Sequence, residues 1–204
     1  MLSVKDAKEI FEEVYKGENG YLVSFYVRKK LPKPDPNLTY GEVKFESFRE
    51  ILKKVKPGKG EIFYDLGSGT GKAVILASLL SPFKKIVGIE LLEDLIKVSE
   101  RVLRRFKKIV KERFPKLVLP QIEFVQGNFL WEDFSEADVV FVHSTCFSDE
   151  LMESLTNRLE NLKKGSRVIT VTQKLNSDSF RSFETESLDL SWGKGTVYFW
   201  EKIK

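Results

Sequence analysis

Cysteine and histidine are nearly absent from this chain of 204 residues, which contains one of each, Cys146 and His143. A single cysteine cannot form a disulfide within the chain and is typical of a reducing compartment, so we expect a cytoplasmic protein. So few thiol and imidazole groups leave little from which to build a transition-metal centre or a cysteine–histidine nucleophilic site. We therefore expect no metal among the site residues.

Long apolar runs are also missing. Hydrophobic residues make up 42% of the chain, but no run approaches the length of about 20 residues that a membrane-spanning helix needs. Positions 1–6 lack the apolar segment of a signal peptide. Lys and Arg total 34 against 30 Asp and Glu, a balance that permits an acidic partner without requiring one. We expect one soluble globular domain that makes no membrane contact.

Residues 61–71 are the most informative stretch of the sequence. An apolar run ends on Asp65, glycines follow at Gly67, Gly69 and Gly71, and apolar residues then recur at helical spacing from position 73. This order predicts a strand, a tight loop and a helix. Glycines let backbone amides approach a ligand closely, and a helix N-terminus attracts the negatively charged part of that ligand. A nucleotide-like cofactor is therefore expected here.

The next apolar run, 86–89, ends at Glu90. A carboxylate at this point can accept hydrogen bonds from both hydroxyls of a ribose, so two strands and two carboxylates would frame one pocket. The alternative is that Asp65 and Glu90 only cap turns at the ends of their strands.

The glycine spacing narrows the choice of cofactor. A dinucleotide fingerprint reads G-x-G-x-x-G, whereas this chain reads G-x-G-x-G with Asp65 just ahead. The stretch 65–71 resembles motif I of the class I S-adenosylmethionine-dependent methyltransferases. That cofactor carries an ammonium group and no phosphate, so a carboxylate suits its site better than a phosphate-binding loop does. The resemblance implies S-adenosyl-L-methionine as the cofactor.

The first 39 residues differ from the rest of the chain. Positions 4–15 have the periodicity of an amphipathic helix, and an aromatic-rich segment, 21–31, is expected to pack beside it. Three prolines within 32–37 then prevent a helix from continuing. We interpret residues 1–39 as a helical N-terminal cap with a Pro-rich connector, and residues 40–204 as the cofactor-binding methyltransferase core.

Helical and strand patterns alternate along that core. Segments 45–56, 93–114 and 149–162 have helical periodicity, segments 121–125, 137–142 and 166–171 are typical of strands, and 183–188 with 196–200 predict a hairpin. The fold class is therefore α/β and Rossmann-like, as in class I methyltransferases, with a mainly parallel twisted sheet, helices on both faces and a C-terminal antiparallel hairpin. Asp65, Glu90, Asn128 and His143 all fall at the carboxyl ends of expected strands, so we expect them at one pocket.

The helix expected over 93–114 is strongly basic. Such a face is usually just solvated, but it also permits a weak contact with nucleic acid. Its basic residues are Lys97, Arg101, Arg104, Arg105, Lys107, Lys108, Lys111 and Arg113.

Further motifs resemble one family in particular, the disruptor-of-telomeric-silencing family of histone lysine methyltransferases, which lack a SET domain. The resemblance covers roughly residues 40–200, and the Tyr-Gly-Glu loop and the Ser-Trp-Gly-Lys hairpin are its most discriminating parts. The motifs, in chain order, are Tyr40-Gly41-Glu42, Asp65-Leu66-Gly67-Ser68-Gly69, Gly127-Asn128-Phe129, 140–147, 162–168 and Ser191-Trp192-Gly193-Lys194 leading to Tyr198.

This resemblance implies a site in two parts. In the first, the Tyr-Gly-Glu loop folds over the cofactor, motif I meets its methionine part, and the residues after the next two strands hold its ribose and adenine. The cofactor-binding residues implied are Tyr40, Gly41, Glu42, Asp65, Gly67, Ser68, Gly69, Gly71, Glu90, Leu91, Asn128, Phe129 and His143.

The second part is a narrow channel that leads a lysine to the methyl group. An apolar, aromatic channel would disfavour an ammonium ion and align the neutral amine for attack. Its implied lining is Val43 together with the catalytic residues Phe141, His143, Trp192 and Tyr198. Trp192 and Tyr198 have an alternative role as core aromatics of the hairpin.

Two stretches, four residues in all, depart from the family pattern. The family has two asparagines and an aromatic residue where this chain has His143, Ser144 and Thr145, and an aspartate where it has Asn128. An amide at Asn128 can still bond an adenine edge. His143 can orient the acceptor or take its proton, and the alternative is a histidine that only caps the strand end.

The leading interpretation is a methyltransferase that acts on a lysine side chain of a protein substrate. One alternative is methylation of nucleic acid or a small molecule, although no Asn-Pro-Pro-Tyr motif for a flipped base follows the fourth strand. The other is a non-catalytic module that uses the cofactor for structure or regulation.

Overall fold

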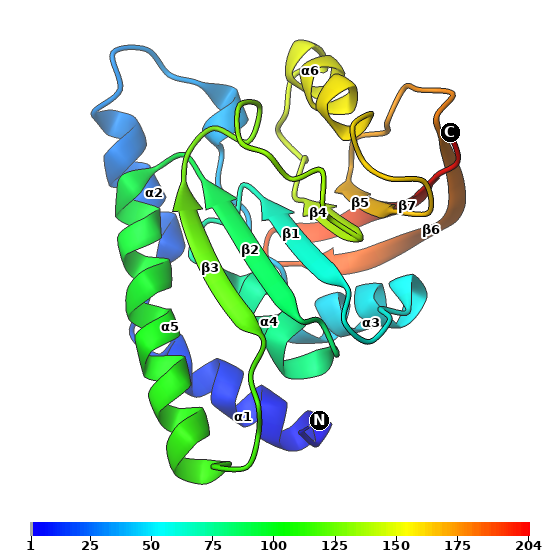
Figure 1. Cartoon of the computed structure of the whole chain (residues 1–204). Helices are drawn as coiled ribbons and strands as arrows, with labels where there is room; N and C mark the ends of the chain where they lie inside the picture. Colours follow the sequence, from blue (N-terminus) through cyan, green and yellow to red (C-terminus); the bar gives the residue numbers. More distant parts are fainter. Residues whose placement is uncertain (1) are drawn as a thin grey trace.

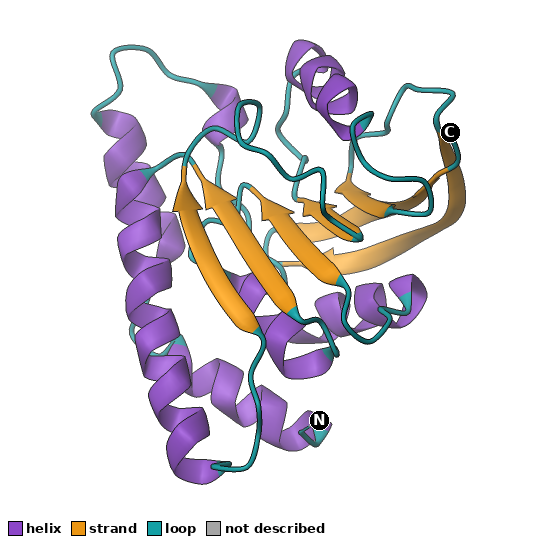
Figure 2. Ribbon diagram, in the orientation of Figure 1, coloured by secondary structure: helices purple, strands orange, loops and turns teal. Residues whose placement is uncertain are grey.

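The computed structural model describes residues 2–204 and contains one seven-stranded sheet with the strand order β3-β2-β1-β4-β5-β7-β6 (Figure 1, Figure 2). The strands are β1 (Ile62–Leu66), β2 (Lys85–Glu90), β3 (Gln121–Gln126), β4 (Val139–Val142), β5 (Arg167–Val171), β6 (Phe180–Leu190) and β7 (Gly193–Lys202). The helices are α1 (Val4–Val14), α2 (Gly20–Lys29), α3 (Phe45–Val55), α4 (Lys72–Leu80), α5 (Glu93–Arg113), α6 (Asp149–Leu159) and a short 3-10 turn, η1 (Pro36–Leu38).

The first five strands of the order pair in parallel, and β7 pairs antiparallel with both β5 and β6. All five residues of β1 and all four of β4 are buried, as expected for parallel strands covered on both faces. The predicted α/β fold with a C-terminal antiparallel hairpin is therefore confirmed.

Two hydrophobic clusters cover the sheet. On one face, α1, α3, α4 and α5 pack around Phe63, Ile86 and Phe141, and on the other α6 packs around Leu66 and Val142. Ala7, Ile10, Phe11 and Val14 of the N-terminal helix belong to the first cluster. Helix α1 therefore shares a core with the rest of the chain.

The terminal hairpin is longer than the sequence indicates. β6 and β7 together run from Phe180 to Lys202, with the turn at Ser191 and Trp192 rather than at the glycines after them. Gly193 has φ of 140°, a backbone conformation that favours glycine. The turn thus carries Trp192 at its tip.

The segment 21–31, expected to pack beside the first helix, instead forms α2, which packs mainly on α5. Its small residues are the buried ones: Gly20 and Ser24 face inward and the helix packs on α5, while Tyr21, Phe25 and Tyr26 are exposed. The reason is close packing at Gly20, where an added Cβ would lie 2.4 Å from the Tyr40 hydroxyl.

Candidate active site

The glycine loop curls over the end of β2. Gly67, Gly69 and Gly71 have φ of 84°, 55° and 82°, in the left-handed region that glycine adopts without strain. The amides of Gly67 and Ser68 both donate to the Ile89 carbonyl, at 2.8 and 2.9 Å. This pairing places the loop between the carboxyl ends of β1 and β2.

Glu90 joins that loop to the turn after β2. Its Oε2 accepts from the Gly69 amide and its Oε1 from the Leu92 amide, both at 2.8 Å. Burial raises the pKa of Glu90, and the bonds from backbone amides oppose this shift. Glu90 therefore does cap a turn, as the alternative held, but its carboxylate also lines a pocket.

Asp65 is the second buried carboxylate. It is 3% exposed, and burial raises its pKa well above the usual range, with the charge of Glu90 adding to the shift. Within residues 2–204 its carboxylate accepts no hydrogen bond from a side chain. Two desolvated carboxylates this close favour a positively charged ligand, which would offset the cost of keeping both ionised.

Two adjoining pockets lie above these strand ends and share Tyr40, Gly41, Gly67 and His143. The first also contains Asp35, Asn37, Leu38, Thr39, Leu66, Glu90, Leu91, Leu92, Leu95, Asn128, Phe129, Leu130, Phe147 and Leu151. The second contains Glu42, Val43, Asp65, Ser68, Lys72, Ala73 and Phe141. Each pocket thus holds one of the two buried carboxylates, and His143 stands where they meet.

The first pocket has an aromatic end that suits a flat heterocycle. Phe129 and Phe147 are stacked, with ring centroids 5.8 Å apart. Asn128 Oδ1 accepts from the Leu130 amide at 2.9 Å, which leaves the side-chain NH₂ of Asn128 as a donor for a ring nitrogen.

The loop Tyr40-Gly41-Glu42 passes directly over the glycine loop. The Tyr40 hydroxyl donates to Glu42 Oε1 at 2.8 Å and bonds Thr70 Oγ1 at 3.0 Å. A Cβ at Gly69 would lie 2.6 Å from the Tyr40 ring, and one at Gly41 would lie 2.6 Å from His143. The glycines are therefore needed here for close approach. That this loop covers the cofactor, as the family resemblance implies, stays a prediction.

His143 and Phe141 form the inner wall at the end of β4. Phe141 is 1% exposed and packs edge-on against Phe48. His143 Nε2 is buried without a hydrogen-bond partner among residues 2–204, and burial lowers the pKa of the imidazole to about 4. The ring is therefore neutral at neutral pH, with an orphaned polar nitrogen at the junction of the two pockets.

Trp192 and Tyr198 lie further out than Phe141. Trp192 is 44% exposed, and its ring stands edge-on to that of His143 with centroids 6.4 Å apart. Tyr198 lies beside Trp200, with the Lys174 ammonium 5.3 Å from its ring centroid. Neither ring is among the described residues that line the two pockets, so the structure puts Trp192 at the rim and Tyr198 outside it.

Several pocket residues were missed by sequence reasoning. The connector, interpreted only as a helix breaker, supplies Asp35, Asn37 and Leu38 to the first pocket. Asn37 Oδ1 accepts from the Ser148 amide at 2.7 Å, which ties the connector to the start of α6. Lys72 enters the second pocket and forms an ion pair with Glu42. An Asp-Pro-Asn turn signal was present, but nothing local indicated its distant partner.

Residues 30–192 match the family described as "Histone methylation protein DOT1". The chain belongs to the DOT1 family. This agrees with the family that the sequence motifs resemble, and the matched range contains every predicted site residue except Tyr198.

Curated relatives carry lysine methyltransferase names. A "Histone-lysine N-methyltransferase, H3 lysine-79 specific" of Caenorhabditis elegans is 32% identical over 184 residues, covering 79% of this chain and 19% of that protein. A "Protein-lysine N-methyltransferase" of Saccharolobus islandicus is 30% identical over 135 residues, covering 66% of this chain and 76% of that protein. The chain thus spans less than a fifth of the first DOT1 relative.

The fold is shared more widely than the DOT1 family. The crystal structure of an RNA methyltransferase from Salinibacter ruber in complex with S-adenosyl-L-homocysteine has a TM-score of 0.62 and 24% identity, covering 85% of this chain and 95% of that chain. At this identity the likeness establishes the class I methyltransferase fold alone.

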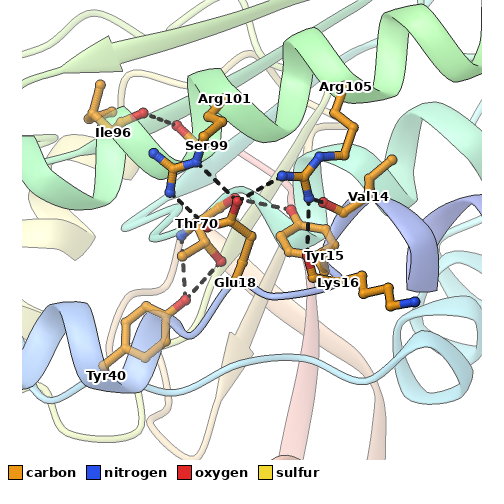
Figure 3. A network of polar contacts seen from close by, with 10 residues as sticks. All are labelled: Val14, Tyr15, Lys16, Glu18, Tyr40, Thr70, Ile96, Ser99, Arg101 and Arg105. Atoms are coloured by element: carbon orange, nitrogen blue, oxygen red, sulfur yellow. Dashed lines mark hydrogen bonds and ion pairs between the residues drawn. The ribbon is translucent and has the colours of Figure 1, made fainter.

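The DOT1 match begins at residue 30, so α1 and α2 lie outside it. A polar network nevertheless connects this cap to the glycine loop (Figure 3). The Tyr15 hydroxyl donates to the Thr70 carbonyl at 3.0 Å, and the Arg105 guanidinium donates to the Val14 carbonyl at 2.6 Å. Glu18 bonds both Arg101 and Arg105. The cap is therefore fixed against α5 and against the loop that carries Gly69.

We expect Glu18→Gln to lower the free energy of unfolding by about 1 kcal/mol, because it removes the charge that two arginines share. The bond from Arg101 lowers the pKa of Glu18 below 4.5, so the difference from the parent should be present above pH 4.5 and vanish as the pH falls through the lowered pKa. Denaturant unfolding at several pH values measures this. Glu12→Gln, at an exposed position of the same cap, is the control; an equal loss there would contradict the account.

The basic face of α5 is partly used inside the protein. Arg101 and Arg105 bond Glu18, and Arg113 pairs with Glu13. Weak nucleic-acid contact through the remaining lysines and arginines stays a prediction. Within residues 2–204, no group of three or more His, Cys, Asp or Glu side chains is arranged to hold a metal, and no helix is both long and apolar enough to cross a bilayer.

Proposed function

We propose that this protein transfers a methyl group from S-adenosyl-L-methionine to a lysine side chain of a protein substrate. The observation that carries the proposal is the pair of joined pockets, each with one buried carboxylate and both bordered by His143. Membership of the DOT1 family and the names of its curated relatives support the lysine acceptor. We further infer a cytoplasmic location from the low cysteine content.

The donor set fits that cofactor. Glu90 would take the ribose hydroxyls, and the wall of Phe129 and Phe147 would take the adenine, with the Asn128 amide at its edge. Asp65 would hold the ammonium group of the methionine part of the cofactor, and Tyr40 would cover this part. Bound S-adenosylmethionine supplies an electrophilic methyl group on a positively charged sulfur.

The protein must then deliver a neutral amine. The entering lysine would first release its proton to water, and its neutral nitrogen would then bond to the methyl carbon as the sulfur–carbon bond breaks. Phe141 and Val43 keep the inner wall apolar, which disfavours the ammonium form of the entering lysine. The neutral His143 Nε2 can accept a hydrogen bond from the amine and so fix the direction of its lone pair.

Methylation of nucleic acid is the second candidate, favoured by the free basic residues of α5. These lie away from the pocket: Arg104 follows the pocket residue Leu95 by nine positions, or roughly 13 Å along the helix axis. Steep salt dependence of RNA binding with base methylation would support it. A non-catalytic module would bind the cofactor and methylate nothing.

The test uses the purified chain with methyl-labelled S-adenosylmethionine and a panel of synthetic peptides that each contain one lysine. Mass spectrometry should find methyl-lysine in at least part of the panel, and much less of it with an Asp65→Asn variant at the same cofactor concentration. Two results would contradict lysine transfer. In one, the label enters RNA and no lysine; in the other, the cofactor binds but the label enters neither RNA nor lysine.

A further inference from the structure

Helix α2 exposes large apolar side chains along one side. Tyr21, Leu22, Phe25 and Tyr26 are 41%, 50%, 45% and 57% exposed, which makes them four of the ten large hydrophobic side chains that residues 2–204 leave exposed. Their spacing puts all four on one helix face. A contiguous patch of exposed apolar side chains is typical of a surface that binds another molecule. We call this set the α2 face.

The orientation of the α2 face is built in. Gly20 and Ser24, on the opposite side, are buried, and Gly20 leaves no room for a Cβ beside Tyr40. The helix therefore cannot rotate its large side chains inward without losing that packing. The exposure of the α2 face is a consequence of the packing of the active-site cover.

The α2 face continues into the rim of the pocket. Tyr21 stands edge-on to Tyr40, with ring centroids 5.3 Å apart, and its hydroxyl bonds the Ser191 hydroxyl. Ser191 Oγ in turn accepts from the Glu42 amide at 3.0 Å, and its neighbour Trp192 stands beside His143. One surface thus runs from α2 across Ser191 and Trp192 to the point where the acceptor enters.

We propose that the α2 face binds the segment of the protein substrate that flanks the target lysine, and that this segment is apolar next to the lysine and acidic beyond it. The proposal rests on the lysine transfer proposed above. The acidic part of the expected segment follows from charge. Lys29, Lys30 and Lys33, at the far end of the helix and just after it, are exposed and form no ion pair within residues 2–204.

A polypeptide suits this surface better than a single-stranded nucleic acid. Bases stack on open ring faces, but Phe25 and Tyr26 meet edge to face at 71°, and the Lys29 ammonium lies 4.7 Å from the Phe25 ring centroid. Leu22, on the same helix face, offers no ring at all. Side chains of a peptide can pack on such an uneven apolar surface.

The test compares peptides of equal length with one central lysine, whose flanks are Leu and Phe followed by Glu, or only Gly and Ser. The double variant Leu22→Ser/Tyr26→Ser changes the two most exposed members of the α2 face. Val118→Ser, at a 90% exposed position of the loop between α5 and β3, is the control. Acetyl-lysine amide, which has no flanks, is the acceptor for basal activity.

The parent should prefer the apolar–acidic peptides over the Gly/Ser peptides roughly tenfold in kcat/KM, and the double variant should lose most of that preference. Val118→Ser should keep it, and turnover of acetyl-lysine amide and cofactor affinity should be unchanged throughout. The α2 proposal would be overturned if the double variant lost activity equally on all acceptors or kept the parent's preference among the peptides. It would also be overturned if the double variant lost RNA binding or self-association and kept its peptide preference. Failure to methylate any lysine would instead overturn the proposed function on which it rests.

Discussion

An Asp65→Asn variant is expected to bind S-adenosylmethionine roughly 100-fold more weakly than the parent, because the ammonium group of the cofactor would lose the charge of a buried carboxylate. The same substitution should leave the fold as stable or make it more stable. Burial and the neighbouring Glu90 raise the pKa of Asp65, so ionising it costs stability as the pH rises above 3.8. An uncharged amide of similar shape removes that cost.

Calorimetric titration gives the affinity and thermal unfolding gives the stability. Asp178→Asn, at an exposed position of the loop before β6, is the matched control and should change neither. A lower cofactor affinity without a lower stability is the diagnostic result, since a general loss of structure would lower both the affinity and the stability. Unchanged cofactor affinity in Asp65→Asn would mean that this carboxylate has a structural role only.

A His143→Ala variant is expected to lose roughly 10²-fold in kcat with little change in cofactor affinity. A nitrogen whose pKa is about 4 is a poor base at neutral pH, so we expect it to orient the amine rather than take its proton. His143→Asn, which keeps an acceptor at that place, should recover most of the activity.

The pH profile separates the two roles. With the pKa of His143 near 4, kcat/KM of the parent should show no inflection around pH 6.5 and should rise only with deprotonation of the acceptor lysine. Cys146→Ser, three positions away, serves as the control. An inflection near pH 6.5 that disappears in His143→Ala would show proton transfer, and full activity of His143→Ala would leave the ring a strand cap.

Much of the site could be predicted because it lies at strand ends. In a parallel sheet, residues at the carboxyl ends of the strands reach the same edge, so Asp65, Glu90, Asn128 and His143 were brought together by a pattern that is visible locally. The glycine loop could be predicted equally well, since its positive φ angles restrict the residue type to glycine.

The rest depended on contacts between distant segments. Nothing near Asn37 in the sequence indicates that its side chain bonds Ser148, 111 positions later. The orientation of α2 was likewise not visible in the sequence, because apolar residues normally face inward and the close packing of Gly20 on Tyr40 is a contact between distant segments. Tyr198 follows the family motif but lies beside Trp200 in the hairpin, where strand pairing decides its place.

The most direct test of the account is a crystal structure of the protein with S-adenosyl-L-homocysteine. We expect the amino group of the ligand at Asp65, its ribose hydroxyls on Glu90, its adenine against Phe129 and Phe147, and its sulfur facing His143. A ligand bound outside the two joined pockets, or reversed so that its ribose meets Asp65, would contradict the assignment of the site and the proposed route of the lysine with it.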